Sequence, residues 1–160
     1  MNNCKLYKII KGKKYMEIKY REANINDKDY ILRAHKEIDK LSGLKDSIFE
    51  KNINKDLFDS KVCKSLVAYM SNVIVGFVLY SYIYWTNCGK GIYLSQAYVD
   101  KKYRKKGLLK SLLKELENRE PDCNFITDLV GSENEVMLKC MNKLNFKSSD
   151  LLVFYRKIDK

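Results

Sequence analysis

Three strand-like runs follow one another in the middle of the chain with only short turns between them. They cover residues 66–70, 73–85 and 92–99, and each is rich in β-branched and aromatic side chains. Residues 71–72 and 87–91 supply the serine, asparagine and glycine residues that tight turns favour. Strands joined by such short turns run antiparallel, because a parallel return needs a long crossover. The middle of the chain therefore predicts an antiparallel meander of three strands.

The pattern changes after residue 99, and the change predicts one parallel strand. A charged loop over 100–106 leads into a helix with leucines on one face, and residues 125–130 then form the next expected strand. A strand–helix–strand crossover returns the chain parallel to its start. The remaining expected elements are a half-buried strand over 15–20, helices over 26–43, 46–58 and 132–144, and one or two strands over 146–158. The fold class is therefore α/β (α+β), with one mixed sheet.

The length of 160 residues fits one domain with its own core. Residues 1–15 are expected to form an N-terminal extension or an edge strand, and residues 16–160 a single domain. No apolar run reaches the ~20 residues needed to span a bilayer. The N-terminus also lacks the apolar segment of a secretory signal. These features predict a cytoplasmic protein without a membrane partner.

The cysteines and the histidine exclude several kinds of site. The five cysteines contain no C-x-x-C pair, and His35 is the single histidine. A zinc site or a Ser-His-Asp triad is therefore not expected, and neither is a bound metal. The cysteines are expected to be reduced thiols in a reducing compartment.

The formal net charge of +11 suits a nucleic acid, an anionic membrane surface or a polyanionic small molecule as partner. Lysine and arginine are spread along the chain rather than gathered in one stripe. A nucleic-acid partner is therefore not favoured, and only a local concentration of basic residues can separate these interpretations.

One such concentration lies where the strand over 92–99 runs through a basic loop into a helix. The loop carries Lys105 and Lys106, Lys110 follows within the first turn of the helix, and Gly107 stands where the backbone must turn. Free N–H groups and the positive end of the dipole make a helix N-terminus an anion site. A pyrophosphate would suit this junction. A solvated basic loop ahead of an amphipathic helix is the alternative interpretation.

The same stretch resembles the acetyl-CoA motif of the GNAT superfamily of N-acetyltransferases, Arg/Gln-x-x-Gly-x-Gly/Ala after a strand. Arg104–Leu109 corresponds to that motif, and Asn134–Phe146 is similar to the family's Asn-x-x-Ala-x-x-apolar-Tyr-x-Lys-Leu-Gly-Phe helix. Ile18–Asp29 is similar to the family's first strand and helix. A weaker resemblance, over Trp85–Leu94, is to the diamine (spermidine/spermine) acetyltransferase branch.

The resemblance implies a GNAT-like mixed, mostly antiparallel central sheet flanked by helices, with a splayed parallel strand pair that forms the acetyl-CoA cleft. Acetyl-CoA would be the co-substrate, and its thioester would bind near the backbone of Tyr98 and Val99. A homodimer is one possible assembly, because family members often pair. The cofactor-binding residues that the resemblance implies are Tyr98, Val99, Arg104, Lys105, Lys106, Gly107, Leu108, Leu109, Lys110, Asn134 and Met141.

The chain departs from the family pattern at three places. Leu109 replaces the second glycine or alanine of the loop, and Met141 replaces the tyrosine that protonates the leaving thiolate. Ser95-Gln96 stands where the diamine branch has Glu-Asp. Ser95 and Gln96 can order a water that relays a proton, but neither attracts a cation. Ser95, Gln96 and Tyr98 are therefore the candidate catalytic residues.

These observations predict an N-acetyltransferase that moves the acetyl group of acetyl-CoA directly to a primary amine. The missing acidic pair and the positive charge favour an amine of low pKa, or one on a molecule with negative groups, over a polyamine. A CoA-binding sensor of the same fold with weak catalysis is the first alternative. A basic nucleic-acid-binding module is a distant second.

Overall fold

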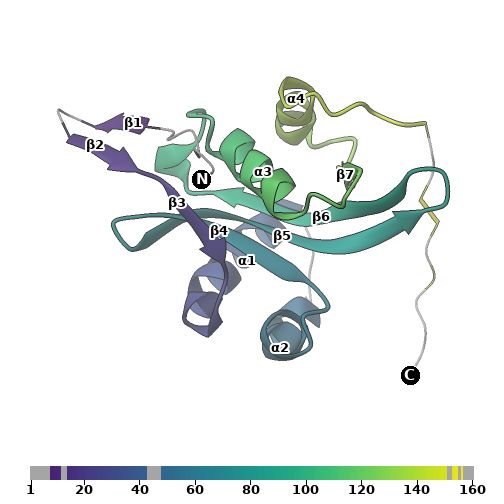
Figure 1. The fold of residues 1–160 in the computed structure, drawn as a ribbon, viewed down its shortest axis with the longest axis horizontal. Helices are drawn as coiled ribbons and strands as arrows, with labels where there is room; N and C mark the ends of the chain where they lie inside the picture. The colour runs from purple at the N-terminus through teal and green to yellow at the C-terminus, as the bar shows by residue number, and fades with distance from the viewer. Residues whose placement is uncertain (1–7, 12–13, 43–47, 151–152, 155, 157–160) are drawn as a thin grey trace. The chain divides into compact units, whose positions relative to one another are not determined.

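The computed structural model describes residues 8–11, 14–42, 48–150, 153–154 and 156 (Figure 1). Contacts within the chain divide it into two compact units, residues 1–129 and 130–160. Each unit is described by itself.

The first unit contains a five-stranded sheet of strand order β3-β4-β5-β6-β7. Its strands are β3 (Lys19–Glu22), β4 (Lys64–Met70), β5 (Val73–Trp85), β6 (Gly89–Val99) and β7 (Phe125–Asp128). Strands β3 to β6 pair antiparallel in sequence order, and β7 alone pairs parallel, with β6. The predicted meander and the predicted parallel strand are both confirmed, and so is the mixed sheet.

Helices cover both faces of this sheet (Figure 1). One face bears α1 (Lys28–Ser42), α2 (Ile48–Ile53) and the π-helical turn η2 (Asn54–Asp59), and the other bears α3 (Leu108–Arg119). On the α1 face, Ile31, Ile53 and Leu57 pack with residues of β4, β5 and β6 in one buried cluster. The buried leucines of α3 cover the other face, because they recur on one side of that helix.

The start of α1 differs in detail from the expected helix over 26–43. A 3₁₀ turn, η1 (Ile25–Asp27), precedes α1, and Asn24 caps it: its side chain accepts a hydrogen bond from the N–H of Asn26, 3.0 Å away. The Asp27 carboxylate in turn accepts the N–H of Asn24 at 2.8 Å, which completes a capping box. The expected helix end at Gly43 lies outside the described residues.

The expected strand over 15–20 is divided in two. A separate two-stranded sheet pairs β1 (Lys8–Lys11) antiparallel with β2 (Lys14–Glu17), and β3 begins at Lys19. The boundary of the domain at residue 16 remains a prediction.

The second unit contains α4 (Glu135–Lys143), which is three residues shorter at its start than the expected helix over 132–144. Among the described residues of 146–158, none lies in a strand, so the expected final strands are not seen there. Residues 151–152, 155 and 157–158 of that stretch lie outside the described residues. No helix within the described ranges is both long and apolar enough to cross a bilayer.

Candidate functional site

The pairing between the parallel strands β6 and β7 ends half-way along β6. Their register runs from Gly91 opposite Phe125 to Leu94 opposite Asp128, where β7 ends. Strand β6 continues to Val99, so the side of Ser95–Val99 that would face β7 has no paired strand within the described chain. Figure 1 shows the short β7 beside the long β6. We call this point the fork. It is the splayed pair that the sequence predicts.

A β-bulge in β6 lies directly beyond the fork. Leu79 pairs with Gln96 whereas Tyr80 pairs with Leu94, so Ser95 is the extra residue of β6. A bulge turns the strand and re-aims the side chains that follow it. Ser95 is exposed, while Gln96 and Tyr98 both turn to the α1 face of the sheet.

The chain then passes from β6 into α3 through a tight basic turn. After the 3₁₀ turn η3 (Lys101–Tyr103), Lys105 and Gly107 adopt the left-handed conformation, with φ of 59° and 79°. Gly107 is the N-cap of α3 and needs glycine for its backbone conformation. A Cβ atom added there would have no heavy atom within 4 Å. The space next to Gly107, at the start of α3, is therefore open.

Two of the predicted cofactor-binding residues use their side chains within the turn itself. Arg104 donates from Nε to the carbonyl of Val99 at 2.7 Å, and Lys106 donates from Nζ to the carbonyl of Lys102 at 2.7 Å. Both bonds tie the turn to itself and to the end of β6. The side chains of Lys105 and Lys110 are exposed beside this turn.

Tyr98 is only 5% exposed and lies in the core under α1. Its hydroxyl donates to Glu37 Oε2 at 3.0 Å, and its ring stacks on Phe77. Burial and the Glu37 carboxylate raise the pKa of the Tyr98 phenol. Its backbone pairs with Phe77 of β5 and has no paired strand on the β7 side, whereas its side chain packs against α1. A catalytic role of the hydroxyl remains a prediction.

Gln96 is joined to a histidine and a carboxylate of α1. Its Nε2 lies 2.5 Å from His35 Nδ1, and His35 Nε2 lies 3.1 Å from Asp39 Oδ2. His35 is 5% exposed. This buried chain of three polar groups is not visible in the sequence, because Gln96 and His35 are 61 positions apart.

Asn134 and Met141 belong to the second unit and are placed only within it. Asn134 is the N-cap of α4, and its Oδ1 accepts the N–H of Met137 at 3.1 Å. Met141 is a buried residue of α4. Their predicted contacts with the cofactor are proposals.

Two groups of side chains have the types that bind metal ions, namely His35 with Asp39 and Glu50, and Glu120 with Asp122 and Cys123. In the first group both ring nitrogens of the histidine already have polar neighbours. In the second, Glu120 accepts the hydroxyls of Tyr80 and Tyr82. These hydrogen bonds account for both groups without an ion, and the absence of a metal stays a prediction.

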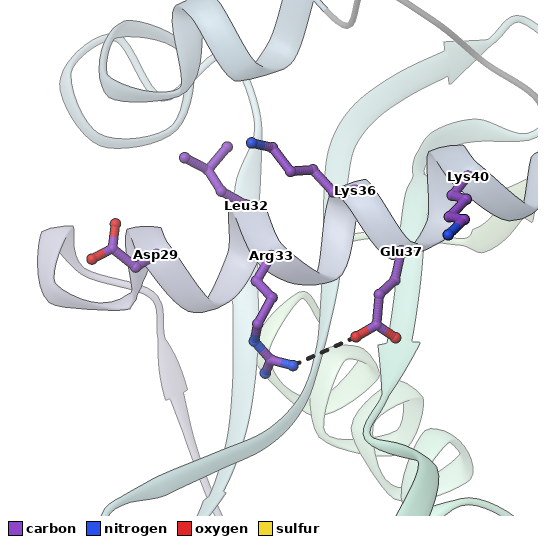
Figure 2. A pocket seen from close by; sticks show the side chains of 6 residues that line it. All are labelled: Asp29, Leu32, Arg33, Lys36, Glu37 and Lys40. Atoms are coloured by element: carbon purple, nitrogen blue, oxygen red, sulfur yellow. Dashed lines mark ion pairs between the residues drawn. The ribbon is translucent and has the colours of Figure 1, made fainter.

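A hollow runs along one face of α1 (Figure 2). Arg33 and Glu37 point the same way in it and form an ion pair of 3.6 Å, and Arg33 also lies 3.7 Å from Asp100. The lining side chains come from a single helix and carry both signs of charge: Asp29, Leu32, Arg33, Lys36, Glu37 and Lys40. The hollow is a feature of the α1 surface, separate from the α3 N-terminus.

A family model described as the acetyltransferase (GNAT) family matches residues 29–146. This match covers β4 to β7, the fork, the basic turn and α3. The chain belongs to the GNAT acetyltransferase family. The recognition made from the sequence motifs is thereby confirmed, while the weaker likeness to the diamine branch stays a prediction.

Solved structures of other GNAT-type proteins show the same fold. A possible acetyltransferase from Clostridium difficile 630 is 23% identical with a TM-score of 0.77, covering 89% of this chain and 99% of that one. The aminoglycoside N-acetyltransferase AAC(6')-Iy in complex with CoA is 19% identical with a TM-score of 0.74, over 91% and 98% of the two chains. A predicted acetyltransferase with acetyl-CoA from Clostridium acetobutylicum is 17% identical with a TM-score of 0.68, over 87% and 96%. No curated protein sequence matches the chain significantly.

Asp128, at the fork of this GNAT domain, is a residue that sequence reasoning missed. It is the last residue of β7 and is half-buried, and burial raises the pKa of its carboxyl to about 6 although the N–H of Leu129 hydrogen-bonds to it. The available signal was that Asp128 is the single acidic residue in the apolar run 125–130. Because burial disfavours the charged form, ionising the Asp128 carboxyl at neutral pH costs free energy.

Asp128→Asn is therefore expected to stabilise the protein at pH 7, by about 1–2 kcal/mol. The folded pKa lies above the unfolded value, so the folded chain holds an extra proton between about pH 4 and pH 6. Stability gained from that proton is present at low pH and lost as the pH rises through this window. Urea unfolding of both proteins at pH 7 and near pH 3.5 measures the difference. Equal stability at pH 7 would contradict the assignment.

Proposed function

We propose that the chain is an acetyl-CoA-dependent N-acetyltransferase that moves an acetyl group directly to a primary amine. The observation that carries the proposal is the fork: unpaired backbone of β6 leads, within one turn, to the free N-terminus of α3. Backbone groups for a pantetheine arm and amides for a pyrophosphate thus follow one another along the chain. Two of the similar structures are described as complexes of CoA with an aminoglycoside N-acetyltransferase. They support the proposal that these backbone groups bind CoA.

The residues at α3 suit the pyrophosphate of acetyl-CoA. The N–H groups of Leu108, Leu109 and Lys110 lack helical partners, because they belong to the first turn. The left-handed Gly107 leaves the approach to them open. Lys105 and Lys110 would add positive charge for the phosphates. The Leu109 side chain is half-buried.

The transfer needs little acid–base chemistry from side chains. The lone pair of the amine forms the new C–N bond, the C–S bond breaks, and the CoA sulfur leaves with its electron pair. Free N–H groups of β6 beyond the fork are suited to stabilise charge on the carbonyl oxygen. The family tyrosine that would protonate sulfur is replaced by Met141, but a thiol with a pKa near ~8.5 leaves tolerably as the thiolate. The proton released by nitrogen passes to water, which Ser95 and Gln96 can order.

The acceptor is proposed to have a low pKa or negative groups near its amine. Ser95 and Gln96 offer no carboxylate at the bulge, and the chain has a net charge of +11. A polycation would therefore be repelled rather than attracted. The proposal includes a cytoplasmic location, supported by cysteines that form no C-x-x-C pair.

Calorimetric titration of acetyl-CoA into the protein tests the cofactor half of the proposal, and we expect micromolar affinity. CoA release with a panel of amines tests the other half; the panel is spermidine, kanamycin, glucosamine 6-phosphate and a peptide with a free N-terminus. Turnover of the sugar phosphate or the peptide above spermidine is the expected result. Binding without any turnover would favour the sensor. Absence of binding would overturn both CoA-based functions and favour the nucleic-acid module.

A further inference from the structure

Asp128 is the acidic residue that the β6–β7 pairing places at the fork. In the parallel ladder it lies opposite Leu94, and it is both the last paired residue and the last residue of β7. Beyond this point β6 continues through Ser95–Val99 without a strand on its β7 side within the described chain. Asp128 is half-buried, so part of its surface stays open to approach. The carboxyl therefore stands where the paired strands end and β6 continues alone.

The pairing also determines the face of the sheet on which Asp128 lies. Leu94 pairs with Tyr80, whose hydroxyl donates to Glu120 at the C-terminal end of α3, so Leu94 lies on the α3 face. Residues paired across neighbouring strands share a face, so Asp128 lies on the α3 face as well. The N-terminus of α3, where the proposed pyrophosphate site lies, belongs to the same face.

The surroundings of this carboxyl favour its protonated form. The buried residues of α3 are leucines and one serine, none of which carries a charge. On β6, the titratable group coupled to Asp128 is the Tyr93 phenol, whose pKa is raised, so it is neutral near pH 7. Burial raises the pKa of Asp128 to about 6, and the hydrogen bond from the N–H of Leu129 opposes this only in part. The group therefore gains and loses its proton close to neutral pH.

The proposed position of acetyl-CoA brings its sulfur to the same place. The pantetheine arm has about twelve bonds between phosphate oxygen and sulfur, as many as about four residues of backbone, so it spans about 14 Å when extended. The stretch Ser95–Val99 covers about 13 Å at the usual rise of a strand. Arg104 donates to the carbonyl of Val99 at 2.7 Å and so holds the basic turn next to the end of β6. An arm that starts at α3 and follows β6 therefore reaches the fork, deeper than the backbone of Tyr98 and Val99.

We propose that Asp128 is a catalytic residue that gives its proton to the CoA sulfur as the thioester is cleaved. The inference rests on the proposed function. The lone pair of the amine forms the C–N bond, the C–S bond breaks, and the sulfur keeps the electron pair and takes the proton from Asp128. Water receives the proton that the amide nitrogen releases and returns one to the Asp128 carboxylate. The step therefore balances without a further reactant, and its products are an amide and the CoA thiol.

Binding of the arm itself brings Asp128 into the form that this step needs. An arm that lies beside a half-buried carboxyl removes water from it, and a carboxyl with less water holds its proton more tightly. The phosphates add negative charge, which acts in the same direction. The pKa of Asp128 is therefore expected to rise from about 6 in the free protein past neutrality in the complex.

Calorimetric titration of dephospho-CoA tests this protonation without any turnover. The probe keeps the pantetheine arm and the pyrophosphate but lacks the 3′-phosphate, a monoester that itself titrates near pH ~6. Titrations at pH 7 in two buffers of different ionisation enthalpy measure the protons exchanged on binding. We expect net uptake, and an affinity that weakens as the pH rises above about 6, because the complex holds the extra proton. Uptake should be lost in Asp128→Asn and retained in Asp128→Glu.

Steady-state kinetics with an amine of the panel that is turned over tests the proton transfer. Asp128→Asn should lower kcat by about 100-fold, the lower end for a positioned general acid, with KM for the amine unchanged. In the unchanged protein kcat should fall on the alkaline side as Asp128 loses its proton, and Asp128→Asn should lack this fall. Asp128→Glu should recover part of the rate. Asp29→Asn, an exposed change of the same kind on α1, is the control.

A loss of folded protein cannot imitate this result, because Asp128→Asn is expected to be the more stable protein at pH 7. Equal proton uptake in the unchanged protein and Asp128→Asn, or an unchanged kcat, overturns the role of Asp128 and leaves the transferase standing. Failure of every amine of the panel, with acetyl-CoA bound, overturns the transfer and the acid role whatever the proton uptake. Failure of acetyl-CoA itself to bind overturns both CoA-based functions and this role with them.

Discussion

Replacing Gly107 by glutamate is expected to weaken acetyl-CoA binding by at least about 100-fold, equivalent to about 3 kcal/mol. Two effects add at this position. The backbone has φ of 79°, which a side chain strains, and the space that a Cβ would enter is open and lies at the first amides of α3. A carboxylate in that space would occupy the proposed phosphate site with the wrong charge. Calorimetry measures the change in affinity.

Gly107→Gln is the matched control, because it imposes the same backbone strain and nearly the same volume without the charge. We expect it to lose about 10-fold in affinity, so the ratio between the two variants isolates the electrostatic part. Thermal unfolding of both variants checks that α3 still forms. If glutamate and glutamine weaken binding equally in folded protein, no anion is held at Gly107.

Asp27→Ala is expected to reduce the free energy of unfolding by about 3 kcal/mol. The Asp27 side chain is 4% exposed and binds both guanidinium nitrogens of Arg21, at 2.5 and 2.8 Å. It also accepts the N–H of Asn24 at 2.8 Å, at the entry to α1. Truncation would leave the Arg21 charge and that N–H without this acceptor. Because Arg21 is partly exposed, water recovers part of the loss.

The stabilisation by Asp27 should depend on pH in a known direction. Burial opposes ionisation of this carboxyl, but the hydrogen bonds from Arg21 and Asn24 outweigh it and lower its pKa. The contribution is therefore complete above about pH 4 and is lost as the pH falls through the folded pKa. Urea unfolding at pH 7 and pH 2.5 measures it, with Asp29→Ala as the exposed control on α1. A cost that is the same at both pH values would show that Asp27 acts through packing alone.

The sequence predicts the sheet well because local patterns determine it. Residues 71–72 and the turn before β6 are short and rich in turn-forming residues, so the strands on either side can pair only antiparallel. The leucine spacing of α3 and the strand after it require a parallel return. Gly107 was correctly singled out as the residue at which the backbone turns, because only glycine adopts its conformation freely.

The details of the site follow from long-range contacts that no local pattern contains. Simple alternation along β6 would place Gln96 on the same face as Leu94, but the extra residue at Ser95 reverses the faces. The partner of Gln96 is His35, which from sequence was an isolated histidine on a helix. Arg104 was expected to bind the cofactor, yet its Nε donates to the carbonyl of Val99 at the end of β6.

The parallel pairing at the fork has a consequence for the order in which the chain folds. Strands β4, β5 and β6 follow one another in sequence and close over short turns. The four-residue β7, in contrast, reaches β6 only after the whole stretch 100–124 has been arranged. Closing a longer loop costs more conformational entropy. The four paired residues of β7 offset only a small part of that cost when they first form. We therefore expect β7 to join only after β4, β5 and β6 have paired. A chain caught before that step would carry the paired strands β4, β5 and β6 without the fork, and so would lack the place where we propose that acetyl-CoA binds.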